Sequence, residues 1–352
     1  MPRTLGNSEL SFVVQAEFTS PAPLCTSIAA HISWRNTMQV ELHRHLDLCT
    51  RPATLYELAQ KSGLIAQSTG FDSFMQSVLI REPMSDLNTV LAKFVIFQKI
   101  LDRPEVLERI AFEAVLDCVA EGIGAVEFRF SPGFVCEYSG LSWSDALDGF
   151  EAGMRRALRS HSDFKAGLIC IASRDLGQES VERTVEFFSQ HRTRFIGLDL
   201  AANECDFPCL GFEGAFREVR KWAKITVHAG EAAGPENIWA AIETLGARRI
   251  GHGISAIKDP KLMDYLAKNS ICLEMCPTSN WLTRAVPSFK EHPLPRVLRA
   301  GVPVCINTDD PGIFATRLPE EVRICRDQMG LSMAEIEFCN EHARKSSFLS
   351  GI

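Results

Sequence analysis

The chain has 352 residues, of which 46% are hydrophobic and 23% charged, as is usual for a globular protein with a sizeable core. The formal net charge of -7 argues against nucleic acid as the main partner, because phosphate binding needs a basic surface. No apolar run approaches the ~18 residues needed to cross a bilayer, so we expect no membrane partner. The 12 cysteines form no CxxC pair, which indicates reduced core thiols and predicts a cytoplasmic protein.

Residues 1–37 differ in character from the rest of the chain. They mix Ser, Thr and Pro with short apolar pieces, show no clear periodicity and precede Met38. They contain few of the arginines of a transit peptide and lack the compact apolar core of a secretory signal. We expect an unstructured leader without a catalytic role, with a mis-assigned start codon or a weak targeting segment as alternatives. One folded domain is expected to follow, over residues 38–352.

The first strand-like run, residues 40–47, carries a His-x-His pattern. On an extended strand, side chains two residues apart share one face, so His43, His45 and Asp47 point the same way. Two neighbouring imidazoles suit a divalent metal, because neutral imidazole nitrogen is a preferred zinc ligand. A pair of half-buried histidines at a strand end is the alternative, and residues further along the chain have to decide between the two.

A long insertion separates the first strand from the second. Residues 53–61 follow Pro52 and form the first predicted helix. Apolar residues at a spacing near 3.6 predict another helix over residues 86–101, and a third is expected over residues 104–121. These inserted helices form either a lid beside the motif strand or ordinary core helices.

From residue 125 onward, strands and helices alternate. The further predicted strands cover residues 125–130, 166–172, 195–200, 225–227, 249–250, 271–275 and 302–306. The predicted helices between them cover residues 144–160, 180–190, 213–223, 235–245, 260–269 and 295–299, with a closing helical region from residue 319. Apolar strands alternating with amphipathic helices predict a parallel sheet, and eight βα units favour a closed (β/α)8 TIM barrel with inserted helices between the first two strands. The absence of GxGxxG after the first strand argues against a dinucleotide-binding fold.

Polar residues gather where the predicted strands end, which is where barrel active sites lie. Each of them alone has an ordinary explanation, such as a hydrogen-bonded core histidine or a carboxylate that caps a turn. It is improbable that chance alone places all of them at the same end of different strands. The residues expected at this rim are His43, His45, His228, Glu231, His252, Asp309 and Asp310.

Four motifs stand in order along the chain: His43-Arg44-His45-Leu46-Asp47, His228-Ala229-Gly230-Glu231, Gly251-His252-Gly253 and Thr308-Asp309-Asp310-Pro311. They are accompanied by Ser131-Pro132, Leu200-Ala201 with Glu204, and Cys276-Pro277-Thr278-Ser279-Asn280. Together they resemble the motif set of the adenosine deaminase family, within the amidohydrolase barrels. The resemblance covers nearly everything from Met38 to Phe348, and it implies one metal-dependent deaminase barrel domain over residues 38–352.

The resemblance implies one zinc ion per chain, bound by His43, His45, His228 and Asp309. The metal would activate a water molecule for attack on purine C6. His252 would orient that water, and Glu231 would act as the general acid that protonates purine N1. Asp310 would contact purine N7.

The resemblance leaves the substrate's sugar side open. Asp47 occupies the position that contacts the ribose 5′ hydroxyl in nucleoside-using members, whereas adenine-using members tend to carry Glu there. Ala202 stands where the family usually has a glycine that offers its backbone N–H to the ring, and residues 48–50 depart from the family's small turn. An adenosine-type nucleoside is therefore the leading substrate, with free adenine or a modified adenosine such as aminodeoxyfutalosine as alternatives.

Other classes of protein fit the sequence less well. An amidohydrolase with two metals bridged by a carbamylated lysine needs a lysine after a middle strand, where this chain has Leu200-Ala201. A metal-free barrel would lack some of the four ligands. The small zinc deaminase fold would require H-x-E with P-C-x-x-C, which this chain does not contain. The expected partner is a small purine, and the oligomeric state stays open because a barrel of this type needs no second chain.

Overall fold

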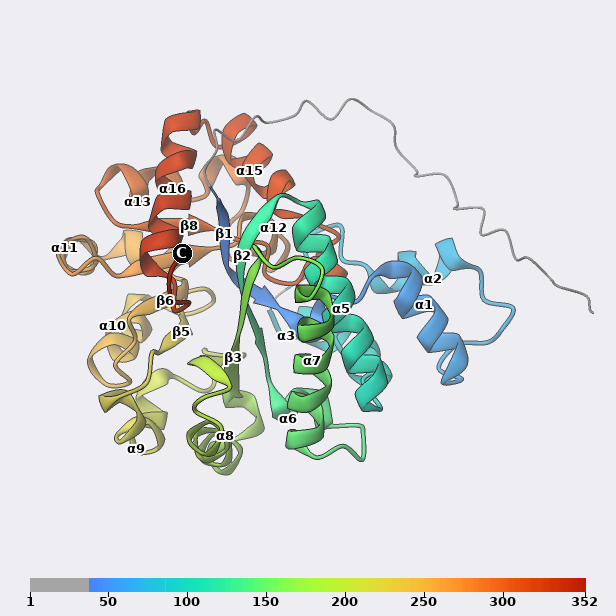
Figure 1. Cartoon of the computed structure of the whole chain (residues 1–352). Coiled ribbons are helices and arrows are strands. Elements are labelled where there is room, and N and C mark those ends of the chain that lie inside the picture. The colour runs from blue at the N-terminus through green and yellow to red at the C-terminus, as the bar shows by residue number, and fades with distance from the viewer. Residues whose placement is uncertain (1–37, 86) are drawn as a thin grey trace, which may run out of the picture. The chain divides into compact units, whose positions relative to one another are not determined.

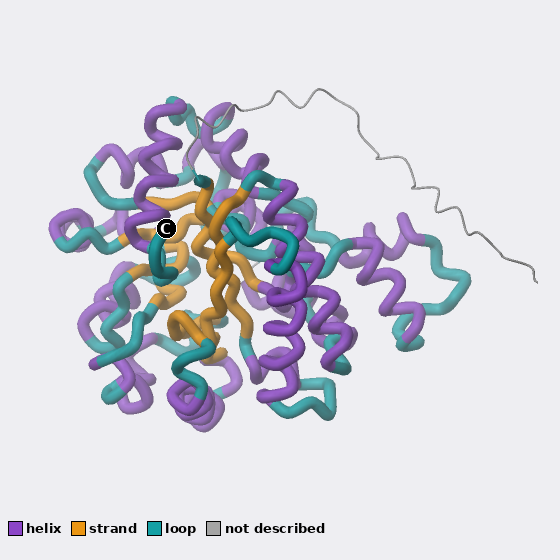
Figure 2. The backbone as a smooth tube through the Cα atoms, in the orientation of Figure 1, coloured by secondary structure: helices purple, strands orange, loops and turns teal. Residues whose placement is uncertain are grey.

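In the computed structural model the strands gather at the centre of the fold and helices surround them (Figures 1 and 2). The structure describes residues 38–85 and 87–352, and Met38–Ile352 form one unit. The predicted leader, residues 1–37, and Asp86, the predicted first residue of a helix, lie outside the described residues.

Eight parallel strands follow one another in two four-stranded sheets, β1-β2-β3-β4 and β5-β6-β7-β8. The strands are β1 Gln39–His45, β2 Ile123–Phe130, β3 Lys165–Ser173, β4 Phe195–Ala201, β5 Thr226–Ala229, β6 Arg249–His252, β7 Cys272–Met275 and β8 Val304–Ile306. Isolated parallel bridges join the two sheets at both seams, between Leu198 and Ile225 and between Arg44 and Asp309. The eight βα units thus close into the predicted (β/α)8 barrel.

The helices lie outside the strands (Figure 2). Many begin with proline in the first turn, where its missing N–H has no partner to lose. Their bounds are α1 Pro52–Lys61, α2 Phe71–Val78, α3 Leu87–Lys93, α4 Val95–Ile100, α5 Pro104–Ala120, α6 Pro132–Cys136, α7 Trp143–Leu158, α8 Gln178–Gln190, α9 Glu213–Phe216, α10 Pro235–Glu243, α11 Pro260–Lys268, α12 Pro277–Leu282, α13 Leu294–Arg299, α14 Pro311–Phe314, α15 Leu318–Asp327 and α16 Met333–Ser346. Among the described residues, no helix is both long and apolar enough to cross a membrane.

Two predicted helices are wrong as single elements. The helix expected over residues 86–101 is divided at Phe94, whose backbone N–H donates to the Leu91 carbonyl at 3.0 Å. This bond to the third residue back tightens the turn and interrupts the α-helical ladder. The helix expected over residues 213–223 ends after one turn, and a 3-10 turn, Val219–Lys221, follows it.

The first strand is also shorter than expected. β1 ends at His45, and Asp47 lies in the 3-10 turn Leu46–Leu48. α2 is a helix that the sequence analysis missed, although its buried Phe74, Met75 and Val78 have helical spacing.

The inserted helices divide between the two roles that the sequence left open. Val90, Leu91, Phe94 and Gln98, from α3 to α4, line a cavity beside β1. α5 instead packs against α7 and β2 as a core helix, with Leu107 and Ile110 fully buried.

Candidate active site

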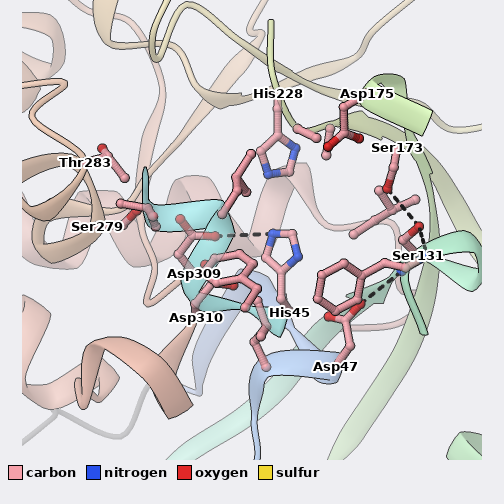
Figure 3. Close-up of a pocket in the computed structure, with 18 of the residues that line it drawn as sticks. His45, Asp47, Ser131, Ser173, Asp175, His228, Ser279, Thr283, Asp309 and Asp310 are labelled. Carbon is pink, nitrogen blue, oxygen red and sulfur yellow. Dashed lines mark hydrogen bonds and ion pairs between the residues drawn. The ribbon is translucent and has the colours of Figure 1, made fainter. Parts of the chain in front are cut away.

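A cavity lies at the carboxyl ends of the strands, and every strand or the residues just after it contribute to its wall (Figure 3). These contributions, in strand order, are His45, Ser131, Ser173, Ala202, His228, His252, Ser279 and Asp309. All the site residues predicted from the sequence line this cavity except His43, which is fully buried. The structure therefore brings the predicted rim residues together.

One atom from each of His43, His45, His228 and Asp309 lies within 4.8 Å of the others, a spacing that fits one metal ion. Oδ1 of Asp309 is 3.2 Å from Nε2 of His43 and 3.2 Å from Nε2 of His45. Nε2 of His43 is buried without a hydrogen-bond partner, so its lone pair is available to a metal ion held by these four residues. Three imidazoles and a carboxylate are a typical donor set for a divalent transition metal.

The protonation states of two of these histidines differ. Burial lowers the pKa of His228 to about 3, which leaves the ring neutral with a lone pair to offer. Burial also acts against protonation of His45, but the carboxylates of Asp310 and Asp309 outweigh it and raise the pKa of His45 to about 9. A metal bound here would take the place of that proton, so its binding would release one.

Two buried carboxylates bind the far nitrogens, Nδ1, of two of these histidines. Nδ1 of His43 lies 2.9 Å from Oε2 of Glu274, and Nδ1 of His228 lies 3.1 Å from Oδ1 of Asp199. Arg129 donates to both carboxylates, at 2.8 Å each. Each carboxylate accepts a hydrogen bond from Nδ1–H, which leaves the Nε2 lone pair of that ring facing the candidate metal group.

Arg129, Asp199 and Glu274 were not predicted as site residues from the sequence. The signal that could have found them is a charged side chain inside an otherwise apolar strand, such as Glu274 in Cys272–Met275 or Asp199 in Phe195–Ala201. A buried charge in a strand needs a partner, and a barrel interior is where the partner can be another strand's side chain.

The loop after β5 carries Glu231 and is clamped by Glu204. Oε1 of Glu204 accepts the backbone N–H groups of Glu231 at 2.6 Å, Ala232 at 2.6 Å and Ala233 at 3.0 Å, while Oε2 accepts that of Gly230 at 2.8 Å. One carboxylate thus satisfies four consecutive amides and fixes the path of the loop.

The Glu231 carboxyl group is suited to donate a proton. Its burial, together with the nearby carboxylates of Asp309 and Glu204, raises the pKa of Glu231 to about 8. Oε1 accepts a hydrogen bond from the Thr283 hydroxyl at 3.1 Å, and Oε2 lies 3.5 Å from Nε2 of His252. A carboxyl group that stays protonated near neutral pH, beside a metal group, can act as a general acid.

Two acidic residues offer unused oxygens at the cavity wall. Oδ1 of Asp310 and Oδ1 of Asp47 are buried without a hydrogen-bond partner. Oδ2 of Asp47 accepts the backbone N–H of Ser131 at 3.2 Å, and the Ser131 and Ser173 hydroxyls lie 2.8 Å apart (Figure 3). Burial and the adjacent Asp309 carboxylate raise the pKa of Asp310 well above its usual value. Both oxygens are therefore free to meet polar groups of a ligand.

Comparison with known proteins agrees with this geometry. The family model described as Adenosine deaminase matches residues 39–351. A protein from Shewanella loihica named adenosine deaminase is 37% identical over 312 residues, which cover 88% of this chain and 94% of the relative. The chain belongs to the adenosine deaminase family.

Solved structures of deaminases and amidohydrolases share the fold of this family member. The adenine deaminase of Arthrobacter aurescens superposes with a TM-score of 0.82 at 23% identity, covering 89% of this chain and 94% of that one. An amidohydrolase from Burkholderia ambifaria, solved with bound zinc, gives a TM-score of 0.79 at 24% identity and covers 89% and 86% of the two chains. At these identities the likeness concerns the barrel itself.

The backbone at Ala202 is strained. Ala202 lines the cavity with a φ of 78°, in the left-handed region that favours glycine. His252 and Asp309 also adopt positive φ values, of 61° and 66°. Left-handed backbone at non-glycine residues is costly and clusters at functional sites, where the surrounding structure imposes it.

Ala202→Gly is expected to stabilise the protein. Relief of the left-handed conformation is worth roughly 1–2 kcal/mol, and the greater freedom of glycine in the unfolded chain takes back roughly 0.4–1 kcal/mol. A higher free energy of unfolding in denaturant titration would confirm this. Ala201→Gly is the matched control, because Ala201 ends β4 without a positive φ and should lose stability instead.

Proposed function

We propose that the protein deaminates adenosine at C6, converting adenosine and water to inosine and ammonia. The observation that carries the proposal is the candidate metal group of His43, His45, His228 and Asp309, which shares one cavity with Glu231 and His252. Support comes from the Shewanella loihica relative, which is named adenosine deaminase and aligns over 88% of this chain.

The metal of this proposal is zinc, one ion per chain. Its support is the donor set of three histidines and one aspartate, which are ligands that zinc prefers and to which a water molecule could be added. The zinc-bound amidohydrolase with the same fold agrees with this choice. When bound, zinc would lower the pKa of a water molecule, so that a hydroxide nucleophile would be available at neutral pH.

The residues around the candidate metal group would donate a proton, orient the attacking oxygen and contact the purine ring. Glu231, protonated in its buried position, would donate its proton to purine N1 and so make C6 electrophilic. His252 would hold the attacking oxygen by a hydrogen bond from Nε2, which lies 3.5 Å from Oε2 of Glu231. The Asp310 carboxyl group, whose pKa is raised well above its usual value, would donate a hydrogen bond to purine N7, and the backbone at Ala202 would border the ring.

The charge of the cavity favours a nucleoside over a nucleotide. The described residues that line it include no Lys or Arg, whereas they include five carboxyl groups: Asp47, Asp175, Glu231, Asp309 and Asp310. A 5′ phosphate would find no Lys or Arg to pair with there, and it would be repelled by Asp47, whose pKa of about 6 leaves it mainly ionised at neutral pH. The neutral 5′ hydroxyl of adenosine could instead donate to Oδ1 of Asp47.

The experiment that tests the function is ammonia release from purified, zinc-loaded protein. The substrates are adenosine, 2′-deoxyadenosine, adenine, AMP, methylthioadenosine and aminodeoxyfutalosine. Turnover of adenosine supports the proposal. Turnover of one alternative alone would mean that residues 48–50 and Ala202 determine which substrate is accepted. If no compound releases ammonia while zinc is bound, the substrate class is wrong.

The setting of this enzyme stays as the sequence predicts it. We infer that residues 38–352 form the catalytic domain and that the protein acts in the cytoplasm, where the free cysteines of the described chain would remain reduced. All residues assigned to the proposed site lie within this chain.

Glu231→Gln should retain zinc and lose nearly all turnover. The amide keeps the shape of the side chain but cannot release a proton to N1, and loss of a general acid typically costs about 10²–10⁴-fold in kcat. Steady-state kinetics with adenosine and elemental analysis for zinc measure both effects. The control is Glu236→Gln, an exposed glutamate in α10; an active Glu231→Gln enzyme would remove Glu231 from its role.

Asp199→Asn should weaken zinc binding. The neutral amide holds Nδ1 of His228 less firmly than the carboxylate does, and loss of such a partner typically costs about 10–100-fold in metal affinity. Competition with a chelating dye measures the affinity. Asp163→Asn, a change at an exposed residue just before β3, should leave it unchanged. Equal affinities of the two variants would contradict the part given to Asp199.

AMP should be a poorer substrate than adenosine. Repulsion of about 1.4–2.7 kcal/mol between a phosphate and the ionised carboxylates at the cavity wall corresponds to roughly 10–100-fold in kcat/KM. Asp175→Lys, at the exposed side of the cavity, should narrow the ratio of the two kcat/KM values. Asp163→Lys changes the net charge equally but lies away from the cavity, so it serves as the control. Similar kcat/KM values for both substrates in the unaltered protein would overturn the charge argument.

A further inference from the structure

A chain of hydrogen bonds runs from His252 away from the cavity. Nδ1 of His252 lies 3.0 Å from Nδ2 of Asn280, and Oδ1 of Asn280 lies 3.2 Å from Nε2 of His292. Nδ1 of His292 in turn accepts the backbone N–H of Leu294 at 3.1 Å. His252, Asn280 and His292 are all at most 2% exposed, so water does not compete for these bonds.

The direction of the chain is set at its outer end by the backbone of Leu294. A backbone N–H can only donate, so Nδ1 of His292 has to be the acceptor. The proton of the neutral His292 ring therefore lies on Nε2, which donates it toward Oδ1 of Asn280. Burial, with a smaller contribution from His252, lowers the pKa of His292 to about 3, so the ring remains neutral at ordinary pH.

A second backbone amide fixes the orientation of Asn280. The N–H of Cys276 donates to Oδ1 of Asn280 at 3.4 Å, and this contact identifies the side-chain atom as the oxygen. The amide nitrogen of Asn280 then faces His252, and its N–H can only donate to Nδ1 of that ring. Two independent backbone donors thus impose the same direction on the chain of bonds.

The consequence reaches the reacting end of the cavity. Because Nδ1 of His252 accepts, its neutral ring carries the proton on Nε2, the nitrogen that lies 3.5 Å from Glu231 and 3.8 Å from Asp309. The backbone of His252 also adopts a positive φ of 61°, a conformation that the surrounding structure has to impose. His252 therefore presents an N–H, and not a lone pair, to the reacting groups.

We propose that Asn280 and His292 are positioning residues that set the tautomer of His252, so that Nε2 donates a hydrogen bond to the attacking oxygen. The inference rests on the proposed deaminase reaction and deepens it. It makes His252 a fixed donor during the attack on C6, since a neutral ring already protonated on Nε2 has no lone pair there to receive the proton of water. A donor held in place before the attack needs no reorganisation in the transition state.

Three variants separate this role from simple packing. Asn280→Asp has the same size but only accepts, so the proton of His252 should move to Nδ1 and leave a bare Nε2 toward the cavity when the ring is neutral. His292→Phe keeps a ring and removes both nitrogens. His292→Gln is its matched control, because its amide N–H can reach the place of Nε2 and restore the bond to Asn280.

The direct measurement is the nitrogen and carbon NMR of labelled histidine in the zinc-loaded protein, with the His252 signals assigned from a His252→Asn variant. The unaltered protein and His292→Gln should show the Nε2–H form of His252, and Asn280→Asp should show a proton on Nδ1. Loss of one positioned donor typically lowers kcat by about 10²–10³-fold, so Asn280→Asp should lose roughly that much while KM changes little. His292→Phe should lose part of kcat, and His292→Gln should recover it.

Three results would overturn the inference: a bare Nε2 on His252 in the unaltered protein, an unprotonated Nδ1 in Asn280→Asp, or equal loss of kcat in His292→Phe and His292→Gln. The last would mean that the ring of His292 acts by packing alone. Because the NMR measurement needs no turnover, it also separates the two proposals. The expected tautomer in a protein that does not deaminate adenosine would sink the proposed function and leave the hydrogen-bond chain intact.

Discussion

The arrangement of the site depends on one guanidinium, that of Arg129, between two carboxylates. Arg129, Asp199 and Glu274 are all fully buried, and burying an unpaired charge costs several kcal/mol. Pairing offsets that cost, and burial notwithstanding, Arg129 and Arg249 hold the pKa of Glu274 well below its usual value. The barrel interior beneath the cavity is therefore ionic at this level, where barrels usually stack branched apolar side chains. The ionised carboxylates then orient the histidines, so the chemistry at the rim depends on charges below it.

Much of the fold and of the site could be predicted because two rules of strand geometry act together. Alternation along β1 places His43 and His45 on one face, and the shared carboxyl edge of a parallel barrel brings His228 and Asp309 to them. Neither rule needs side-chain detail. They fail where a local choice depends on packing, as at Phe94, where one predicted helix becomes two because a buried ring at the cavity wall coincides with a tightened turn.

The partners behind the histidines could not be predicted, because they depend on which side chains meet across non-adjacent strands. Glu274 of β7 reaches His43 of β1, although β8 lies between these strands in the barrel order. Sequence periodicity indicates which face a residue takes, and not which residue it meets at what distance. The same limit applies to Ala202, whose left-handed backbone follows from the path of the chain after β4 and contradicts the local preference of alanine.

These partners also sort three of the site's four histidines into two kinds. His43 and His228 each face a carboxylate with the nitrogen turned away from the cavity, and a carboxylate accepts the N–H hydrogen bond there and leaves the other nitrogen's lone pair for a metal. His252 faces an amide N–H in the same position, which leaves it with a proton to donate. Distance alone would also group His252 with Cys276 and Asp309 as metal ligands, but Nδ1 of His252 already accepts from Asn280, and the Nε2 of its neutral ring then carries the proton. For these three rings, the distal partner thus decides whether the ring can bind a metal or hold an oxygen.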